Sequence, residues 1–526
     1  MHLDRHAHRL MLGLYILCSI LICAQLIYAF VGLNASSLWI DELWTGWLIK
    51  PAYIPSILAR SVTDVHPPVY YLFLHFWTLL FGTTAAVMRA FSAVCAVLAV
   101  VALIALTPRW IGLAGRLFAG AIAVTSPQWL DQSQNARMYA LGFLLGLWLA
   151  LVALHALSAV RSGREVRRST FAALAVSAFL FSFCHFYMFV AALGVLGFLA
   201  AASPRWPDRL AFAGIGAVLF VCMLAFIVVL LEHTEVPIQD TWFSNSPSAI
   251  IDMTVRGITR QVRLLPLAVL SVLMVAATIL PRLRRPAAGM DSAVPMPSAL
   301  LMMLFVIAFV IVAGIASSLG IAPNYSDRNV AVAAPFAWLG VAILVDYAVR
   351  ALPRWAAAAL LALLAAAIAL HALEQWHRLR AARTEHRAAS NYIRALPQCA
   401  GKPIPVTLKT DQPGAAAAQG FTRYRFAYYL PGYPLAGVGY RSGRLSMADG
   451  TKRLLSRREA GLDECPVLAM IADTSGFDIE GFASSLRRAL DGRPHGAPAR
   501  PIAIVPFPHY DVYGNRLTEA WVLRRP

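Results

Sequence analysis

The stretch SLWIDELWTGWLIKPAYIPSILARSVTDVHPPVYY, residues 37–71, is the part of the sequence that best indicates the fold. It follows an apolar run that is long enough to cross a bilayer as a helix. It places Asp41 beside Glu42, and then Asp64 and His66 just ahead of two prolines. Carboxylates at a membrane boundary lose hydration, so they are costly there and indicate a function. A solvated loop whose acids cap helices is the alternative, and the rest of the chain decides between the two.

Composition and charge argue against a soluble globular protein and against a nucleic-acid-binding protein. The chain of 526 residues is 59% hydrophobic and 14% charged, whereas a soluble domain carries about 25% charged residues. Its formal net charge is +18, but the Lys and Arg residues lie in short connections between apolar runs, as membrane topology requires. The first apolar run lacks an A-x-A-like cleavage site, so we interpret it as the first transmembrane helix and not as a removed signal peptide.

The distribution of basic residues predicts the topology. Arg5 and Arg9 precede the first span, which places the N-terminus in the cytoplasm and the loop with Asp41 outside. Five later connections are strongly basic, and all are expected on the cytoplasmic side. They contain Arg109 and Arg116, Arg161 to Arg168, Arg205 and Arg209, Arg282 to Arg285, and Arg350 and Arg354. The apolar runs and the cytoplasmic assignment of these connections together predict about eleven spans, with the C-terminus outside.

Two apolar segments have lengths that do not fit a single span. Residues 67–81 would form a helix of about 22 Å, against a hydrocarbon core of about 30 Å. We therefore expect this segment to lie along the outer face or to dip into it. Residues 169–202 would form a helix of about 50 Å with basic residues at both ends, so they are expected to cross twice. The turn is expected at Cys184–Tyr187, with His185 near the outer face.

This topology gathers the remaining polar features on the outer side of the membrane. They are Asp41 and Glu42, Asp64 and His66, Arg89, Asp131 and Arg137, His185, Glu232 to Asp240, and Asp327 and Arg328. A transport path needs ionisable groups at mid-membrane depth, and charges within the predicted spans are scarce. The asymmetry therefore favours an external active site at the lipid boundary.

Several of these stretches resemble the GT-C glycosyltransferases, in particular the branch of bacterial protein O-mannosyltransferases and lipid A aminoarabinose transferases. The resemblance covers about residues 10–350, and its most specific parts are the Asp-Glu pair and the His-Pro-Pro segment. The stretches are WIDELW, DVHPPVYYLFLHFWTLLFG, SPQWLDQSQNARMYAL, the CHFY turn and the late YSDRN. Relatives often have Arg-Tyr at the late motif, whereas Asn329 follows Arg328 here. The resemblance implies inverting transfer of a sugar from a polyprenyl-phosphate donor to an acceptor hydroxyl outside the cytoplasmic membrane.

This chemistry assigns roles to the residues on the outer side. A hydroxyl nucleophile needs a proton acceptor in the transition state, and Asp41 is the candidate, with Glu42 orienting the acceptor or substituting for it. The lipid phosphate that leaves needs charge stabilisation by fixed cations. The candidates for binding the donor phosphate are Arg137, Arg328 and His66. The candidates for binding substrate are Asp64, Tyr70, Tyr139 and His185.

Each of these residues also has a purely structural interpretation. Arg137 could anchor a lipid headgroup, and Arg328 could pair with Asp327. His185 could be a hydrogen-bonded histidine at a helix end, and His66 could cap the helix that follows it. Metal-ligand spacing occurs at Glu232-His233-x-Glu235, but no Cys or second His lies nearby, so a divalent metal is unsupported and no cofactor is predicted. No P-loop or dinucleotide-binding motif is present in the sequence.

The composition changes at about residue 374. Strand-like stretches follow at IPVTLKT, PVLAMIA and PIAIVPF, with a hairpin expected at Asp511–Leu523. The stretch RYRFAYYLPGY could cover the active site, although a buried amphipathic element is favoured. Two cysteines, Cys399 and Cys465, lie in this region, and they are expected to form a disulfide if the domain is extracytoplasmic.

We therefore expect a polytopic α-helical membrane protein of the GT-C type with a small extracytoplasmic α/β domain at its C-terminus. Residues 1–373 would form the catalytic domain, with juxtamembrane helices in the first external loop at 34–86, and residues 374–526 the second domain. The expected location is the bacterial cytoplasmic membrane. Expected partners are membrane lipids, a polyprenyl-phosphate-linked sugar, and an acceptor that is a lipid, a glycan or a protein. The alternative function is a lipid or polysaccharide transporter or flippase. The sequence leaves open which sugar and which acceptor are used.

Overall fold

The computed structural model describes residues 2–526 except 52, 63, 65, 234–244, 280–295, 380–385, 410–415, 442–443, 473–477, 491–500 and 511–515. The chain divides into two compact units, which we describe separately. The first contains residues 1–31 and 53–375 and is helical; the second contains residues 32–52 and 376–526. Residues 32–52 were expected with the first domain, so their membership of the second unit is a finding of the structure.

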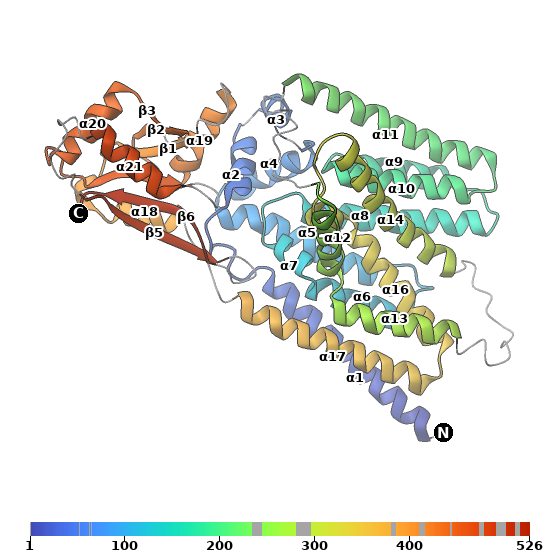
Figure 1. Ribbon diagram of the computed structural model, residues 1–526. Coiled ribbons are helices and arrows are strands. Elements are labelled where there is room, and N and C mark those ends of the chain that lie inside the picture. Colours follow the sequence, from blue (N-terminus) through green and yellow to red (C-terminus); the bar gives the residue numbers. More distant parts are fainter. Residues whose placement is uncertain are drawn as a thin grey trace. The chain divides into compact units, whose positions relative to one another are not determined.

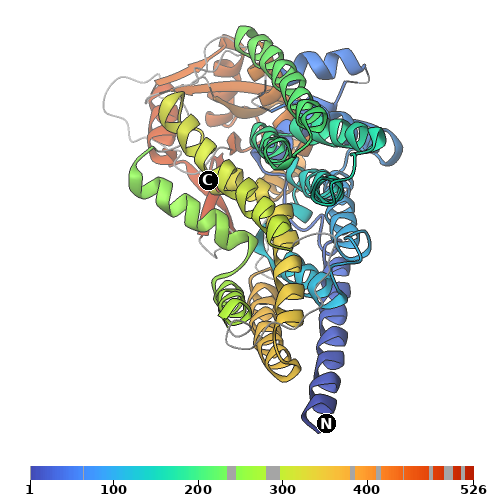
Figure 2. The ribbon, with the colours of Figure 1, turned by 90° about the vertical axis from the view of Figure 1, so that its right-hand side faces the viewer.

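The helices of the first unit follow the apolar runs of the sequence (Figure 1). Those before the turn at His185 are α1 (His2–Tyr28), α3 (Ile54–Ser61), α4 (Val69–Phe81), α5 (Ala85–Ala105), α6 (Leu113–Thr125), α7 (Pro127–Ser133), α8 (Tyr139–Arg161) and α9 (Arg168–Ser182). Those after it are α10 (Phe186–Ala202), α11 (Trp206–His233), α12 (Pro247–Gln261), α13 (Leu264–Ile279), α14 (Met296–Gly320), α15 (Asp327–Val330), α16 (Ala334–Ala351) and α17 (Arg354–Leu379), with the 3-10 turn η2 (Ala331–Ala333) before α16. Figure 2 shows α1 along one edge of this unit, with the N-terminus at its end.

Seven helices of the described chain are long and apolar enough to cross a membrane, or eight if the bent pair α12 and α13 counts as one span. The axes of that pair meet at 78°. Four further apolar helices, α4, α6, α9 and α10, are shorter. The predicted short helix at 67–81 and the predicted turn at His185 both match the observed elements. The expected number of eleven spans stays a prediction.

Close packing around α16 forms the centre of the helical unit. This helix lies against α6, α8, α13 and α14, and most of its side chains are buried. Gly115 of α6 permits the close approach of α16, because a Cβ atom at position 115 would lie 2.2 Å from the carbonyl oxygen of Ala342 in α16. Asp346 adds a polar link, since its carboxylate accepts a hydrogen bond of 2.9 Å from the backbone N–H of Gly112 at the start of α6. A larger residue at position 115 is expected to force the two helices apart.

The second unit is built around a six-stranded sheet. Its strands are β1 (Ile404–Lys409), β2 (Leu435–Arg441), β3 (Arg444–Met447), β4 (Val467–Ala472), β5 (Ala503–Tyr510) and β6 (Arg516–Arg524), in the order β3-β2-β1-β4-β6-β5. Strand β1 is parallel to β2 and β4, and the other pairs are antiparallel. The strands expected at IPVTLKT, PVLAMIA and PIAIVPF are β1, β4 and β5. The expected hairpin is β5 and β6, while its turn lies outside the described residues.

Helices cover both faces of this sheet. They are α18 (His386–Arg394), α19 (Ala416–Tyr429), α20 (Asp449–Glu459) and α21 (Ile479–Leu490), with the 3-10 turn η3 (Pro397–Cys399) before β1. Helix α2 (Ile40–Ile49) packs against α19. One hydrophobic core joins α18 and α19 to one face of the sheet, and another joins α20 and α21 to the other. Successive side chains of a strand point to opposite faces of the sheet. In β6, Val522 therefore belongs to the first core, and Trp521 and Leu523 belong to the second.

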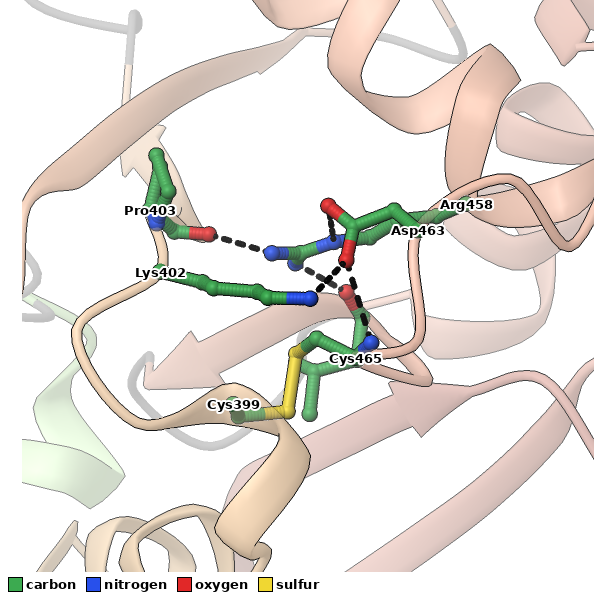
Figure 3. Close-up of a disulfide and its surroundings, with 7 residues drawn as sticks. Cys399, Lys402, Pro403, Arg458, Asp463 and Cys465 are labelled. Carbon is green, nitrogen blue, oxygen red and sulfur yellow. Dashed lines mark hydrogen bonds and ion pairs between the residues drawn. A yellow bond between two sulfur atoms is a disulfide. The ribbon is translucent and has the colours of Figure 1, made fainter.

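The expected disulfide between Cys399 and Cys465 is present. It joins the turn before β1 to the segment before β4, across a sequence separation of 66 residues. Figure 3 shows it beside the buried guanidinium of Arg458. That guanidinium donates to the carbonyl oxygens of Val467 (2.6 Å) and Pro403 (2.8 Å). The loops next to the central strands β1 and β4 are therefore fixed by both a covalent bond and a hydrogen-bonded cation.

Candidate active site

Five of the predicted site residues meet within the first unit. They form what we call the histidine cluster, which consists of Asp64, His66, Arg137, Tyr139 and His185. The residues come from three separate parts of the chain: the loop before α4, the start of α8, and the turn between α9 and α10. A backbone hydrogen bond of 3.0 Å from Val69 N–H to the carbonyl oxygen of Phe183 links the first of these parts to the third.

The side chain of His66 lies at the centre of the cluster. Its Nδ1 atom is 3.2 Å from Asp64 Oδ2 and 3.4 Å from Arg137 Nη2. Because a guanidinium can only donate, Nδ1 accepts from Arg137 when it carries no hydrogen and donates to Asp64 when it does. The tautomer of His66 therefore determines which of the two its Nδ1 atom bonds. This arrangement couples a cation, a carboxylate and a proton-carrying ring within one small volume.

Asp64 is buried, with 8% of its side chain exposed. Its Oδ2 atom also accepts a hydrogen bond of 2.5 Å from the Tyr71 hydroxyl. Burial alone would raise the pKa of this carboxyl, but His66, Arg137 and the Tyr71 hydroxyl together hold the pKa below its usual range. Asp64 is therefore a carboxylate at neutral pH, and it supplies the negative charge that keeps two basic side chains together.

His185 has a structural role as well as a place in the cluster. Its Nδ1 atom accepts a hydrogen bond of 3.1 Å from the backbone N–H of Tyr187, which caps the start of α10. Its ring centroid is 5.2 Å from that of His66 and 5.6 Å from that of Tyr139. Burial, and then the neighbouring His66 and Arg137, lower the pKa of His185 well below its usual range. A neutral ring is expected there, and the structural interpretation of His185 is correct at least for Nδ1.

The structural interpretation of His66 receives no support from the structure. The residue at the start of α4 is Pro68, and no side chain caps that helix. Tyr70, the remaining residue predicted from this segment, is fully buried on α4 and packs edge-on against Tyr71, with ring centroids 5.7 Å apart. Tyr70 thus adjoins the tyrosine that holds Asp64.

Arg328 belongs to a second polar group, which we call the arginine–carboxylate group. Arg260 of α12 lies between two carboxylates in it, bonding Asp131 of α7 and Asp327 of α15, the latter at 2.9 Å. Asp131 also experiences the positive charge of Arg328. The carboxylate of Asp327 thus bonds the Arg260 guanidinium, and it accepts from the backbone N–H of Arg328 at 2.9 Å. The arrangement fixes the short helix that carries Arg328.

Asp41 and Glu42 lie in the second unit, in the first turn of α2. Glu42 is buried, and its Oε2 atom accepts a hydrogen bond of 3.2 Å from the backbone N–H of Trp39. It therefore caps its own helix, which was the structural interpretation of the acids in this stretch. Asp41 is half-buried, so the two neighbouring carboxylates have different environments.

Among the described residues, no group of three or more His, Cys, Asp or Glu side chains could hold a metal ion. The sequence suggested metal-ligand spacing at Glu232-His233-x-Glu235. Glu232 and His233 are the last two residues of α11, and Glu235 lies outside the described residues. The histidine cluster offers one carboxylate and two histidine rings, and the Arg137 guanidinium already lies among them. Its chemistry therefore fits an anionic ligand better than a metal ion.

Sequence reasoning missed several residues of these two groups. Arg260 was missed because the helix that carries it, α12, was not predicted, and no element was assigned to residues 247–261. The signals present were the Ser246-Pro247 start, at which the Ser246 side chain caps the helix, and the apolar spacing that follows. Tyr71 was missed because nothing in the sequence distinguishes it from Tyr70.

Comparison with solved structures identifies the fold. The crystal structure of ArnT from Cupriavidus metallidurans in the apo state matches with a TM-score of 0.54 and 13% sequence identity, and the match covers 96% of this chain and 97% of that one. A structure of the same protein bound to undecaprenyl phosphate matches with a TM-score of 0.46 and 14% identity over 80% of this chain and 85% of that one. No family model and no curated protein matches the sequence. The chain therefore has the fold of the first of these structures, with a helical unit and a small C-terminal sheet domain.

Proposed function

We propose that this protein is an inverting glycosyltransferase that moves a sugar from a polyprenyl-phosphate donor to an acceptor hydroxyl on the outer face of the cytoplasmic membrane. The observation that carries the proposal is the buried Asp64–His66–Arg137 group within a GT-C fold. A fold alone does not imply an activity, so the argument depends on the chemistry of this group.

In the proposed reaction the acceptor oxygen attacks the anomeric carbon of the donor sugar. The bond between that carbon and the phosphate oxygen breaks, and the electron pair leaves with polyprenyl phosphate. The proton of the acceptor hydroxyl passes to a carboxylate, and the configuration at the anomeric carbon inverts. The reaction thus requires a proton acceptor for the nucleophile and positive charge for the leaving phosphate.

The first unit supplies the groups proposed for the phosphate. Arg137 is 4% exposed, and a guanidinium in such a poorly solvated place interacts strongly with an anion. His66 can add a second donor, and the Asp64 carboxylate lies 3.2 Å from its Nδ1 atom. Arg328 provides a further cation in a group of its own. Tyr139 and His185 add ring surfaces for a sugar to contact.

Asp41 is the proposed proton acceptor, on chemical grounds. Glu42 is occupied as the cap of α2, so it orients the helix, while Asp41 stands beside it with part of its side chain accessible. A positioned carboxylate contributes about 10²- to 10⁴-fold to such a reaction. Replacing Asp41 by Asn keeps the shape and removes the basicity.

The test uses purified protein in liposomes with a labelled mixture of polyprenyl-phosphate sugars and candidate acceptors, in which release of polyprenyl phosphate is measured. We expect wild type to consume one donor and Asp41→Asn to be slower by about 10²-fold or more. The matched control is Asp449→Asn, the same change at an exposed position of α20 in the same unit; it should behave as wild type.

Other outcomes have clear meanings. Equal turnover by wild type and Asp41→Asn would exclude Asp41 as the proton acceptor and make Glu42 the next candidate. Failure of wild type to consume any donor would contradict the transferase and favour the transporter. Folding of each variant is checked by its elution as a single species in detergent.

A further inference from the structure

We propose that the C-terminal part of the chain positions the carboxylate-bearing helix α2 through two tyrosines of α19, Tyr424 and Tyr429. The inference rests on the proposed function, because it concerns the helix that carries Asp41. Helices α2 and α19 both belong to the second unit and pack against each other, although they are far apart in the sequence. Tyr424 and Tyr429 are positioning residues in this proposal, since they act on the reaction only through α2.

The first contact fixes the chain just before α2. The backbone N–H of Leu38 donates a hydrogen bond of 2.5 Å to the Tyr429 hydroxyl. Leu38 is fully buried and Tyr429 is 7% exposed, so water does not replace this acceptor. A buried N–H without an acceptor costs about 1–3 kcal/mol. The ring of His386 stacks on that of Tyr429, with centroids 6.2 Å apart and planes at 13°, and holds the tyrosine in turn.

The second contact fixes the body of α2. A Cβ atom at Gly46 would lie 2.5 Å from the Tyr424 hydroxyl oxygen, so the helix backbone and this side chain are in direct contact. Glycine within a helix is less favourable than alanine by about 1 kcal/mol, and the close approach of Tyr424 gives a physical reason for it here. The ammonium of Lys50 lies over the same ring, 5.6 Å from its centroid.

A third set of contacts fixes the segment that leads into α2. The backbone N–H of Arg387 donates to Ser37 Oγ at 2.9 Å. The Arg387 guanidinium donates to the carbonyl oxygen of Asn34 at 2.5 Å and to its Oδ1 atom at 2.9 Å. The segment 34–38 is therefore held by α18 as well as by α19.

These contacts matter because of where the acids lie. Asp41 and Glu42 are in the first turn of α2, between the Leu38 contact and the Gly46 contact. With the helix fixed on both sides of that turn, the direction of the Asp41 side chain follows from residues about 390 positions away. Misplacing a catalytic group by about 1 Å can cost about 10²-fold in rate. The C-terminal part of the chain would therefore act on the reaction through the position of α2.

The decisive variant is Tyr429→Phe in the full-length protein, because it removes one oxygen atom and keeps the ring that packs on His386. The matched control is Tyr392→Phe, which changes a partly buried tyrosine of the same unit whose ring packs against Phe507 of β5. Two quantities are measured: hydrogen exchange of the peptides covering residues 37–49, and the steady-state kinetics of transfer in liposomes.

We expect Tyr429→Phe to speed exchange in residues 37–49 by about tenfold or more, and to leave the β1 and β4 peptides unchanged. We expect kcat to fall by about tenfold or more while KM for the polyprenyl donor is unchanged, because the groups proposed for the phosphate are in the first unit. Tyr392→Phe should change neither quantity. Gly46→Ala is a second variant, and it should reproduce both effects by displacing the Tyr424 hydroxyl.

The results separate this inference from the proposed function. Wild-type exchange and wild-type kcat in both Tyr429→Phe and Gly46→Ala would overturn the positioning role while leaving the transferase intact. Faster exchange with unchanged kcat would overturn it too, because the contact would then be structural only. Absence of turnover by wild type would instead contradict the proposed function, and the exchange data would show separately whether the tyrosines hold α2.

Discussion

Arg458 and Arg137 are two of the buried arginines among the described residues, and their side chains are bonded in different ways. Arg458 in the second unit is fully buried and bonds two backbone carbonyl oxygens and the carboxylate of Asp463. Arg137 in the first unit is 4% exposed and lies against the ring of His66, which shares its Nδ1 atom with Asp64. The first arginine bonds groups that mostly cannot titrate, and the second lies among groups that can.

The difference indicates what each arginine does. Backbone carbonyls stay where the fold puts them, so a guanidinium that bonds two of them links segments of the chain permanently, as Figure 3 shows for Arg458. Side chains that exchange protons and rotate leave a guanidinium able to change partners when an anion arrives. We therefore interpret Arg458 as structural and Arg137 as functional, and each of the following measurements can break or sharpen that contrast.

The largest expected effect is on transfer by Arg137→Gln. We expect the rate to fall by about 10²- to 10³-fold, the loss typical of removing one donor that stabilises developing negative charge. Thermal stability should change little by comparison. The control is Arg161→Gln, an exposed arginine at the other end of α8, which should keep wild-type activity. If Arg137→Gln were much less stable than wild type but its folded fraction transferred sugar at the wild-type rate, Arg137 would be structural and the interpretation would be reversed.

The complementary change is Arg458→Met. It keeps most of the volume but leaves two carbonyl oxygens and part of a carboxylate without their donor. We expect a loss of about 3 kcal/mol in the local stability of the second unit, measured by hydrogen exchange of β4 and α20. Its exposed neighbour on α20, Arg457→Met, should lose far less. If Arg458→Met exchanged like wild type and yet failed in transfer, Arg458 would have to be reassigned.

Some features of the fold could be predicted from the sequence and others could not, for physical reasons. The turn at His185 was predictable because helix length and membrane thickness are both fixed quantities. Strand β4 was predictable because all six of its residues are apolar. The contact of Leu38 with Tyr429 was not, because it joins residues 391 positions apart through a single hydroxyl. Arg260 was missed because its helix is amphipathic and therefore resembles a polar loop between membrane spans.

The candidate site shows the same limit. The sequence placed Asp64, His66, Arg137 and His185 on the outer side from charge distribution alone, and the structure brings those four together. Charge distribution could not separate Glu42, which caps its helix, from Asp41, because a cap is defined by a hydrogen bond and not by residue type. It also could not indicate that Asp131 and Asp327 share one arginine.

The smallest expected effect concerns pH and the carboxylate beside Arg458. Burial would raise the pKa of Asp463, but hydrogen bonds from Lys402 and from the Cys465 backbone N–H, and the charge of Arg458, hold that pKa below its usual range. A carboxylate with a lowered pKa in the folded state stabilises that state fully above its unfolded pKa of about 3.9. The stabilisation is then lost as pH falls through the folded value.

Hydrogen exchange of the β4 peptide, corrected for intrinsic rates at each pH between about 3 and 6, should therefore reveal a drop in local stability at the acidic end. Asp463→Asn should be less stable near neutral pH and should lose this drop, whereas the adjacent exposed change Glu464→Gln should keep it. A drop that persisted in Asp463→Asn would have to come from another carboxylate. In that case the bonds of Arg458 to backbone carbonyls would account for its structural role without Asp463.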